Sequence, residues 1–229
     1  VFTVGNQLRE AIELHTDRKG KEAEARAVEM LTLVGVNEPE KRVKQYPYEL
    51  SGGMRQRVMI AMALACEPDI LIADEPTTAL DVTIQAQILE LMQELQKKLG
   101  MAIIMVTHDL GVIADMCDEI IVLYGGRVCE RGTAEDIFYR PCHEYTKGLL
   151  RSIPNVDRIG EKLIPIPGTP INLLNMPKGC AFCPRCENAM KICIEEVPQE
   201  MQMPDGHYAS CWLNVKAAME AEQGGRKHE

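Results

Sequence analysis

Short apolar runs alternate with a long amphipathic helix in the middle of the sequence, and this alternation constrains the fold more than any other feature. The apolar runs at residues 70–73 and 102–106 have the length of buried strands. Between them, Asp81 can cap a helix that extends to about Leu99 and carries its large apolar residues on one face. A further apolar run, 120–123, turns at two glycines into a second strand, as in a hairpin. Strands and helices that alternate in this way predict an α/β domain with a mostly parallel sheet.

The residues in front of these strands are predicted to form short helices. One apolar stripe at helical spacing begins at Val4, and a second is followed by Gly35, which can end a helix in the left-handed conformation. Ser51 can cap a third helix, which extends from about Gly53 to Cys66 and stops before a proline. We therefore expect a helical segment before the first strand.

Charge and hydropathy restrict the classes of protein to which this chain of 229 residues can belong. The net charge of −9 provides no basic field to collect phosphates, so a nucleic-acid partner is not expected. The longest apolar run, residues 58–66, is far shorter than the ~20 residues that a membrane-spanning helix needs. No basic-then-apolar signal stands at the N-terminus. We expect a soluble, cytosolic chain.

Cysteine is common, with nine residues, five of which lie between Cys180 and Cys211. Because the number is odd and no secretory segment is visible, metal ligation together with free thiols is expected rather than a disulfide framework. These five cysteines follow a proline-rich stretch, residues 153–177, which predicts an extended linker. The clustering indicates a small lobe in which the cysteines serve a local purpose, such as binding a metal.

Two short motifs indicate chemistry. In Leu50–Arg57 a Ser-Gly-Gly turn opens a helix, so backbone N–H groups and the positive end of the helix dipole can meet a phosphate. In Ile70–Glu75 an apolar strand ends in two carboxylates, which can hold Mg²⁺ and polarise water. Alone, the first motif could be an ordinary capped helix and the second a solubilising strand end.

In this order and spacing the motifs resemble those of the ATP-binding cassette (ABC) ATPases. Leu50–Gln56 is similar to the signature motif, Ile70–Glu75 to the Walker B strand, and Ala79–Asp81 to the D-loop. Thr78 stands where many family members have serine, and His108 is similar to the switch histidine. The resemblance implies an α/β fold that is part of a RecA-like P-loop ABC ATPase core, with a helical subdomain and a small cysteine-rich C-terminal lobe.

The resemblance also implies a role for each matching residue. Glu75 would be the general base that polarises the attacking water, and His108 would contact the γ-phosphate, so both would be catalytic. Asp74 would contact Mg²⁺, and Asp81 would lie at a dimer interface besides capping its helix. The signature residues would contact ATP in trans; these are Ser51, Gly52, Gly53 and Gln56.

One element of the family is missing from the sequence. No Gly-x-x-x-x-Gly-Lys-Ser/Thr phosphate loop occurs, and no convincing Q-loop glutamine precedes the helical segment. Since the chain starts with Val1 rather than Met, we expect a fragment whose N-terminal segment lies outside the sequence. Because the phosphate loop supplies N–H groups to the β- and γ-phosphates, the chain alone is not expected to hydrolyse ATP measurably.

Three segments narrow the resemblance to the ATPase subunits of oligopeptide, dipeptide and nickel importers. They are residues 74–87, residues 143–150 and the cysteine-rich C-terminus, which generic cassettes lack. Within the second segment, Glu144 stands where this branch usually has proline. Together with the general motifs, the resemblance covers nearly the whole chain.

The C-terminal cysteines resemble an iron–sulfur binding motif of that branch. Four of them match it: Cys180, Cys186, Cys193 and Cys211. Four thiolates suit a [4Fe–4S] cluster, with Cys183 as a possible further ligand. Zn²⁺ bound by four of the cysteines, or with His207, is the alternative, and free thiols are a third interpretation.

The predicted organisation has three parts. Residues 1–66 would form the helical signature subdomain, residues 67–152 the C-terminal part of the RecA-like core, and residues 153–229 a proline-rich linker with a cysteine-rich regulatory or Fe–S domain. ATP and Mg²⁺ are the expected cofactors.

The resemblance implies an ATP-hydrolysing subunit that powers the import of di- or oligopeptides through a membrane ABC transporter. It would pair with a second ABC ATPase subunit, identical or not, and with transmembrane permease subunits that a peptide-binding protein feeds. It would lie at the cytoplasmic face of the plasma membrane. The alternatives are a non-transport ABC ATPase of the DNA-repair or translation type, and a metal- or redox-sensing module built on the cysteines. The cargo, whether a peptide, nickel or another solute, does not follow from the sequence.

Overall fold

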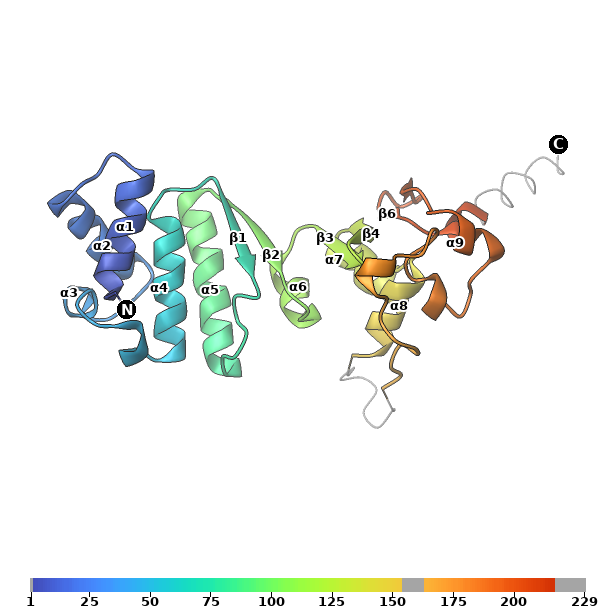
Figure 1. The fold of residues 1–229 in the computed structure, drawn as a ribbon, viewed down its shortest axis with the longest axis horizontal. Coiled ribbons are helices and arrows are strands. Elements are labelled where there is room, and N and C mark those ends of the chain that lie inside the picture. Colours follow the sequence, from blue (N-terminus) through green and yellow to red (C-terminus); the bar gives the residue numbers. More distant parts are fainter. Residues whose placement is uncertain (1, 154–162, 217–229) are drawn as a thin grey trace. The chain divides into compact units, whose positions relative to one another are not determined.

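The computed structural model describes residues 2–153 and 163–216 (Figure 1). The chain divides into two compact parts, which we call the N-terminal unit (Val1–Val112) and the C-terminal unit (Ile113–Glu229). The domain boundaries expected from the sequence, at 66/67 and 152/153, differ from this division and stay a prediction. Each unit is described by itself.

The N-terminal unit begins with helices, as the apolar stripes predicted. They are α1 (Val4–His15), α2 (Lys21–Leu33), the short α3 (Pro39–Arg42), a 3₁₀ turn η1 (Pro47–Glu49) and α4 (Gly52–Leu64). Buried residues at helical spacing, such as Leu8 and Ile12 on α1 and Leu31 on α2, form the core between them. Gly35 has a φ of +71°, which agrees with its expected place after α2.

The strand pair of the N-terminal unit consists of β1 (Ile70–Asp74) and β2 (Ala102–Val106), which run parallel. The helix α5 (Val82–Leu99) connects them and lies beside the pair in Figure 1. Alternate strand residues face opposite sides, so Leu71 and Ala73 are buried whereas their neighbours point outwards. The strands were expected to be buried, but the outward face is apolar and at least half exposed; it consists of Ile70, Ile72, Ile104 and Val106.

The sheet of the C-terminal unit is antiparallel, which corrects the prediction of one mostly parallel sheet. Its strands are β3 (Ile120–Tyr124), β4 (Arg127–Gly132), β5 (Met201–Gln202) and β6 (Tyr208–Ala209), in the order β3-β4-β6-β5. The expected hairpin joins β3 to β4 through Gly125 and Gly126, both at positive φ. Because β6 pairs with β4, a two-residue strand of the cysteine-rich segment belongs to the same sheet as the hairpin.

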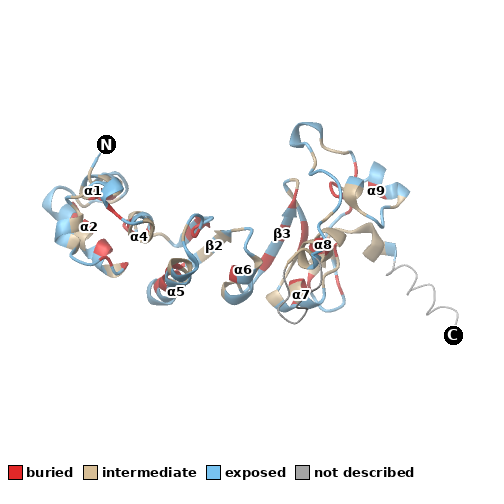
Figure 2. Ribbon diagram, turned by 90° about the horizontal axis from the view of Figure 1, so that it is seen from below, coloured by how far each residue is buried: buried red, intermediate tan, exposed pale blue. Residues whose placement is uncertain are grey.

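Two helices of the C-terminal unit, α7 (Ala134–Tyr139) and α8 (Glu144–Arg151), pack on β4 of this sheet. The unit also contains the short helix α9 (Lys191–Glu195) and the 3₁₀ turns η3 (Leu173–Asn175) and η4 (Cys183–Arg185), while α6 (Leu110–Met116) spans the boundary between the units. Along β3, buried and exposed residues alternate (Figure 2). One core cluster joins Tyr124 and Cys129 of the hairpin to Ala181 and Phe182 of the cysteine-rich segment. The hairpin and the cysteine-rich segment therefore share a core.

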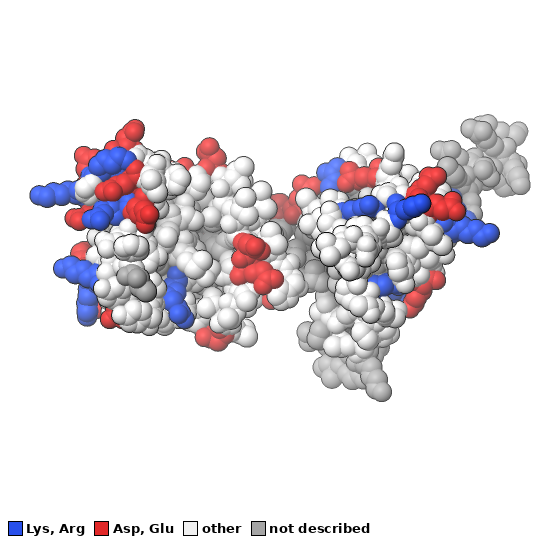
Figure 3. Space-filling model, viewed as in Figure 1, with Lys and Arg blue, Asp and Glu red and all other residues white. Residues whose placement is uncertain are grey.

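Charged side chains of both signs gather over α1–α3 on the face that Figure 3 shows. Two of the ion pairs there connect separate elements: Arg9 of α1 with Glu24 of α2, at 3.6 Å, and Arg26 of α2 with Glu67, at 2.9 Å. Exposed pairs such as the first contribute about 0–1 kcal/mol each, so these helices are stabilised mainly by their apolar core. Among the described residues, no helix combines the length and the apolar character needed to cross a lipid bilayer.

Candidate functional site

Glu75 lies at the tip of β1, where the chain leaves the strand. Its backbone N–H still donates to the carbonyl of Val106 on β2, at 2.8 Å. Its φ, however, is +45°, in the left-handed region that residues other than glycine rarely adopt. Ala79, four residues later, also has a positive φ of 62°. Left-handed residues in such a short connection mark a backbone held in a costly conformation, which is a frequent property of functional sites.

Two side chains hold the carboxylate of Glu75. Its Oε2 accepts a hydrogen bond from the hydroxyl of Thr78, at 2.7 Å, and its Oε1 lies 2.9 Å from Nδ1 of His108. Thr78 follows β1 whereas His108 follows β2, so the parallel pairing of the strands brings these segments together. The Glu75 side chain is 43% exposed and that of His108 81%, which leaves both open to a ligand.

The hydrogen bond from Thr78 lowers the pKa of Glu75, and the hydrogen bond to His108 lowers it further. The carboxyl group is therefore ionised at neutral pH, the form in which a carboxylate can accept a proton. The structure brings together the two residues predicted to be catalytic. It adds Thr78, whose hydroxyl was noted in the sequence only as a replacement for serine.

Asp74 is the last residue of β1, and Val106 of β2 stands opposite it in the parallel register. It is exposed and, by the alternation along the strand, lies on the same face as Ile72. Its carboxylate thus stands at the same strand end as Glu75, where carboxylate oxygens are suited to Mg²⁺.

The predicted signature residues start α4. Ser51 is exposed, and its Oγ accepts from the backbone N–H of Met54 at 3.4 Å, the geometry of an N-cap. A Cβ atom at Gly52 would lie 3.4 Å from a methyl group of Leu80, which places the signature next to the D-loop. Gln56, one turn further along α4, is half-buried. A helix N-terminus of this kind, which begins with two glycines, can bind an anion.

Asp81 has the capping role that the sequence predicted. Its Oδ1 accepts from the backbone N–H of Ile84 at 2.9 Å and begins α5. Its exposed position leaves room for the second role, at an interface between subunits.

Sequence reasoning missed a side-chain contact that ties α5 to the segment carrying His108. Gln85 Nε2 donates to Asp109 Oδ2 at 3.0 Å, and Asp109 Oδ1 accepts from the backbone N–H of Gly111 at 3.0 Å. An aspartate before a helix is a capping signal, so the role of Asp109 at the start of α6 was readable from the sequence. Its contact with Gln85 depends on the tertiary structure and was not.

The five C-terminal cysteines line one cavity of the C-terminal unit, together with His143, Phe182 and Trp212. They are Cys180, Cys183, Cys186, Cys193 and Cys211, and all are free thiols. Burial raises the pKa of most of them, to about 11 for Cys186. Thiols whose pKa is raised in this way stay protonated at neutral pH unless a metal binds, because a metal ion stabilises the thiolate.

The separation of these sulfur atoms bears on the choice of metal. In a tetrahedral zinc site the four sulfurs lie about 3.8 Å apart, because each is ~2.3 Å from the ion. Within the described part of the chain, no three of these cysteines meet a 4.8 Å limit, although two other groups of residues do. A cluster holds its sulfurs further apart, because each binds a different iron. His207, the alternative zinc ligand, belongs to those other groups.

Comparison with known sequences covers both units. Residues 2–78 match the ABC transporter family, and residues 129–193 match the C-terminal region of oligopeptide and dipeptide transporters. The dipeptide transport ATP-binding protein DppD of Bacillus subtilis is 53% identical over 98% of this chain and 67% of its own length. The oligopeptide transport ATP-binding protein OppD of Salmonella typhimurium is 53% identical over 93% of this chain and 63% of its own length. The chain thus spans about two thirds of the length of these relatives.

Solved structures share the fold. A bacterial ABC transporter cassette, MJ0796, solved as a dimer, is 33% identical with a TM-score of 0.51, over 58% of this chain and 57% of that chain. An inward-facing ABC transporter of a metal-chelate type has a TM-score of 0.56 at 22% identity, over 65% of this chain and 57% of that chain. At that identity the second likeness bears on the fold alone. These neighbours confirm the α/β ABC ATPase fold that the motifs implied.

Proposed function

This chain belongs to the family of ATP-binding subunits of oligopeptide and dipeptide ABC transporters, and from this premise we propose that it serves in the ATPase subunit of a peptide importer. The observation that carries the proposal is the contact of Glu75 with His108 at the exposed end of β1. A carboxylate and an imidazole placed there meet the needs of phosphoryl transfer to water, which are positioning and charge stabilisation.

Glu75 is the general base in this proposal. Its carboxylate takes a proton from the water that attacks the γ-phosphoryl group of ATP, and ADP leaves in line. Thr78 and His108 fix the orientation of the carboxylate, and the imidazole also faces the γ-phosphate. Asp74 would hold Mg²⁺, which supplies the positive charge that neutralises the phosphate oxygens.

The signature residues act on a nucleotide bound mainly by a second subunit. Ser51 is exposed at the start of α4, so its helix N-terminus is available to phosphate groups of a neighbour. Gly52 and Gly53 line the same start, with Gln56 behind them, and Asp81 begins the adjacent helix. A dimer of cassettes, with the same or a related chain as partner, is therefore part of the proposal.

The five-cysteine cavity suits a [4Fe–4S] cluster better than a single Zn²⁺. Cys180, Cys186, Cys193 and Cys211 would be the ligands, with Cys183 as a possible further one, and the gathering of all five thiols around one cavity supports the cluster. Such a group would stabilise a segment whose regular structure is limited to short elements. Redox or metal sensing at this cavity is the second candidate function, favoured by the same five thiols.

The partners follow from the family. Permease subunits would dock the ATPase at the cytoplasmic face of the plasma membrane, and a peptide-binding protein would deliver di- or oligopeptides to them. The two relatives above carry dipeptide and oligopeptide transport in their names, which supports peptides as the cargo.

Reconstitution of the full-length subunit with its permeases in proteoliposomes tests the function. We expect ATP hydrolysis that rises with peptide-loaded binding protein and falls about 10²–10⁴-fold in Glu75→Gln, the range for loss of a general base. Glu90→Gln, on the exposed side of α5, is the matched control and should hydrolyse ATP at the wild-type rate. Undiminished hydrolysis by Glu75→Gln would show that Glu75 is not the general base. Peptide transport without coupled ATP hydrolysis would contradict the proposed function.

Iron and acid-labile sulfide analysis of the anaerobically purified protein tests the cluster. Four irons and four sulfides per chain are expected for this cluster type. Zinc in place of iron at the five cysteines would establish the alternative, and reversible change of the ATPase rate with the redox state of the protein would favour sensing.

A further inference from the structure

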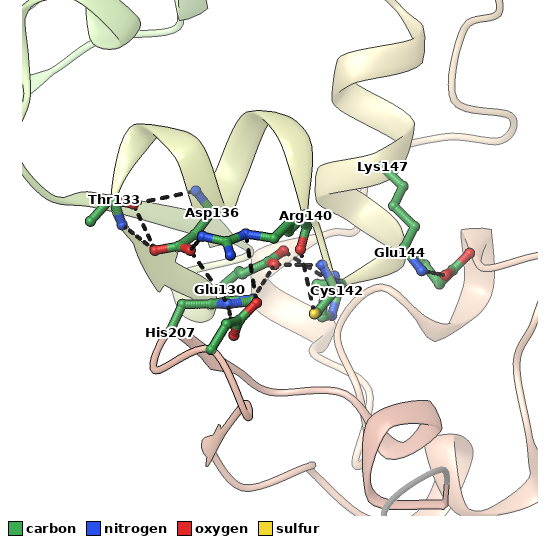
Figure 4. Close-up of polar contacts among 10 residues, drawn as sticks. Glu130, Thr133, Asp136, Arg140, Cys142, Glu144, Lys147 and His207 are labelled. Atoms are coloured by element: carbon green, nitrogen blue, oxygen red, sulfur yellow. Dashed lines mark hydrogen bonds and ion pairs between the residues drawn. The ribbon is translucent and has the colours of Figure 1, made fainter.

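A second group of potential metal ligands in the C-terminal unit includes none of the five C-terminal cysteines (Figure 4). It comprises Glu130 of β4, Cys142 just before α8, and His207 just before β6. The carboxylate oxygen, the sulfur and the ring nitrogen all lie within 4.8 Å of one another. Glu130 is 1% exposed and His207 is 3% exposed. Burying a charged or polar side chain costs free energy unless a hydrogen bond, an ion pair or a metal satisfies it.

The two ring nitrogens of His207 differ in their surroundings. Nδ1 lies 2.7 Å from Oδ1 of Asp205, which fixes the tautomer with the proton on Nδ1. Nε2 is fully buried and has no hydrogen-bond partner, although it lies 3.4 Å from Oε1 of Glu130. With the proton on Nδ1, Nε2 presents a lone pair towards another buried acceptor. That arrangement is unfavourable unless something positively charged lies between them.

The carboxylate of Glu130 is fixed in place and still has acceptor capacity. Its Oε1 accepts from the backbone N–H of Cys142 at 2.5 Å, and its Oε2 from that of His143 at 3.0 Å. Each oxygen has two lone pairs, so one remains on each. These backbone contacts also bring the Cys142 side chain to the side of the carboxylate that faces His207.

The opposite side of the His207 ring is already occupied by protein groups. Asp136 Oδ2 accepts from the Thr133 hydroxyl at 2.7 Å and its Oδ1 is paired with Arg140 at 2.5 Å, while Arg140 also lies 3.7 Å from Asp205. Because a guanidinium already balances these carboxylates, the unused position is on the Nε2 side.

We propose that Glu130, Cys142 and His207 form a binding site for a divalent cation of the zinc type. One oxygen, one thiolate and one imidazole suit zinc, which binds such ligands at ~2.0–2.3 Å and therefore holds them about 3.3–3.8 Å apart. The Glu130–His207 separation of 3.4 Å is within this range, and rotation of the Cys142 side chain adjusts the third ligand. The Cys142 thiol proton is released to solvent on binding, and water takes the fourth position.

Asp205 is a positioning residue of this site. A carboxylate that accepts from the second nitrogen of a metal-binding histidine orients the ring and raises its basicity. The site would connect β4, the start of α8 and the β5–β6 hairpin, which are far apart in the sequence. It would hold the β5–β6 hairpin on the sheet through ligands other than the five C-terminal cysteines.

Zinc and iron analysis of the full-length protein tests the proposal. After incubation with Zn²⁺ and desalting, we expect one zinc per chain besides any iron, and at least a tenfold higher Kd for Zn²⁺ in Cys142→Ser and His207→Gln. Cys117→Ser, a half-buried cysteine of the same unit, is the matched control and should bind zinc as the wild type does. With Co²⁺ in place of Zn²⁺, the sulfur-to-metal absorption should be present in the wild type and lost in Cys142→Ser. Asp205→Asn should keep that absorption while its affinity falls about 10–100-fold.

Alkylation of the wild-type protein keeps the test independent of how the variants fold. Zn²⁺ should protect Cys142 from a thiol reagent, as read by peptide mass spectrometry. Equal labelling of Cys142 with and without Zn²⁺ would overturn the proposal, as would an unchanged Kd in a folded Cys142→Ser.

Discussion

Gly53 on α4 lies directly against Ile84 on α5, so closely that a Cβ atom at residue 53 would be 2.7 Å from the Ile84 Cγ2 atom. The absence of a side chain at this position therefore has a packing reason in addition to the phosphate-binding reason that the sequence suggests. The adjacent Gly52 is different, because a Cβ atom there would make an ordinary contact with Leu80 at 3.4 Å.

Substitution by alanine can therefore distinguish the roles of the two glycines. Gly53→Ala should lower the free energy of unfolding by about 1–3 kcal/mol, as overpacking does, and Ile84→Ala in the same protein should restore part of it. Gly52→Ala should change stability much less. Urea unfolding of the four proteins measures this, and equal losses for the two glycines would contradict the packing argument.

The hydrogen bond from Thr78 to Glu75 should be visible in the pH dependence of ATP hydrolysis. Because this bond lowers the pKa of Glu75, Thr78→Val should raise that pKa, so the acidic limb of the kcat profile should move to higher pH. Thr78→Ser keeps a hydroxyl and should retain the wild-type profile. A limb that stays in place in Thr78→Val would mean that another group limits the rate in acid.

Removing the metal that we propose for the five-cysteine cavity should loosen the C-terminal unit selectively. We expect faster amide exchange and proteolysis after about Lys178, extending into β4 because it pairs with β6. Helices α4 and α5 should keep their protection, since they belong to the N-terminal unit. Unchanged exchange between residues 179 and 211 after chelation would argue against a metal in the cavity.

Arg185 should stabilise the proline-rich segment through the planar geometry of its guanidinium group, so that the positive charge of a lysine cannot replace it. Its guanidinium donates to the carbonyls of Ile166 and Pro167, both at 2.9 Å, and thereby holds the proline-rich segment against η4. Arg185→Lys cannot make both contacts in the same planar geometry, so cleavage between residues 163 and 171 by an added protease should be faster. Lys191→Arg, on exposed α9, is the control for a general charge effect. Equal cleavage rates in wild type and Arg185→Lys would contradict this role.

Features set by neighbouring residues were predictable from the sequence. The caps at Ser51 and Asp81 lie where the capping signals placed them. The sequence also predicts a capping box of Thr133 with Asp136, and this box is present at the start of α7. That Glu75 and His108 belong to one site was an expectation from the family resemblance alone, since no local signal gives the distance between two strand ends.

Features that depend on distant residues were not predictable. Strands β5 and β6 have two residues each, too few for a periodic pattern, although Pro204-Asp205-Gly206 was a readable turn signal between them. The antiparallel order of the second sheet depends on the pairing of β4 with β6, which no periodicity reveals. The left-handed φ of Glu75 is likewise imposed by its surroundings, because glutamate has no preference for it. The sequence also predicts a charged helical tail, Asn214 to about Glu222, and this segment lies mostly outside the described residues.

The place of β6 beside β4 has a consequence for synthesis of the protein. On a ribosome the β3–β4 hairpin emerges long before residues 208–209, so one edge of β4 has no partner during that interval. The carboxylate of Glu130 likewise has no contact with His207 until residue 207 has been synthesised. The sheet of this half is thus completed only after residues 208–209 have been synthesised, and a stop codon upstream of them would leave a nascent chain with an open β edge for chaperones or proteases to recognise.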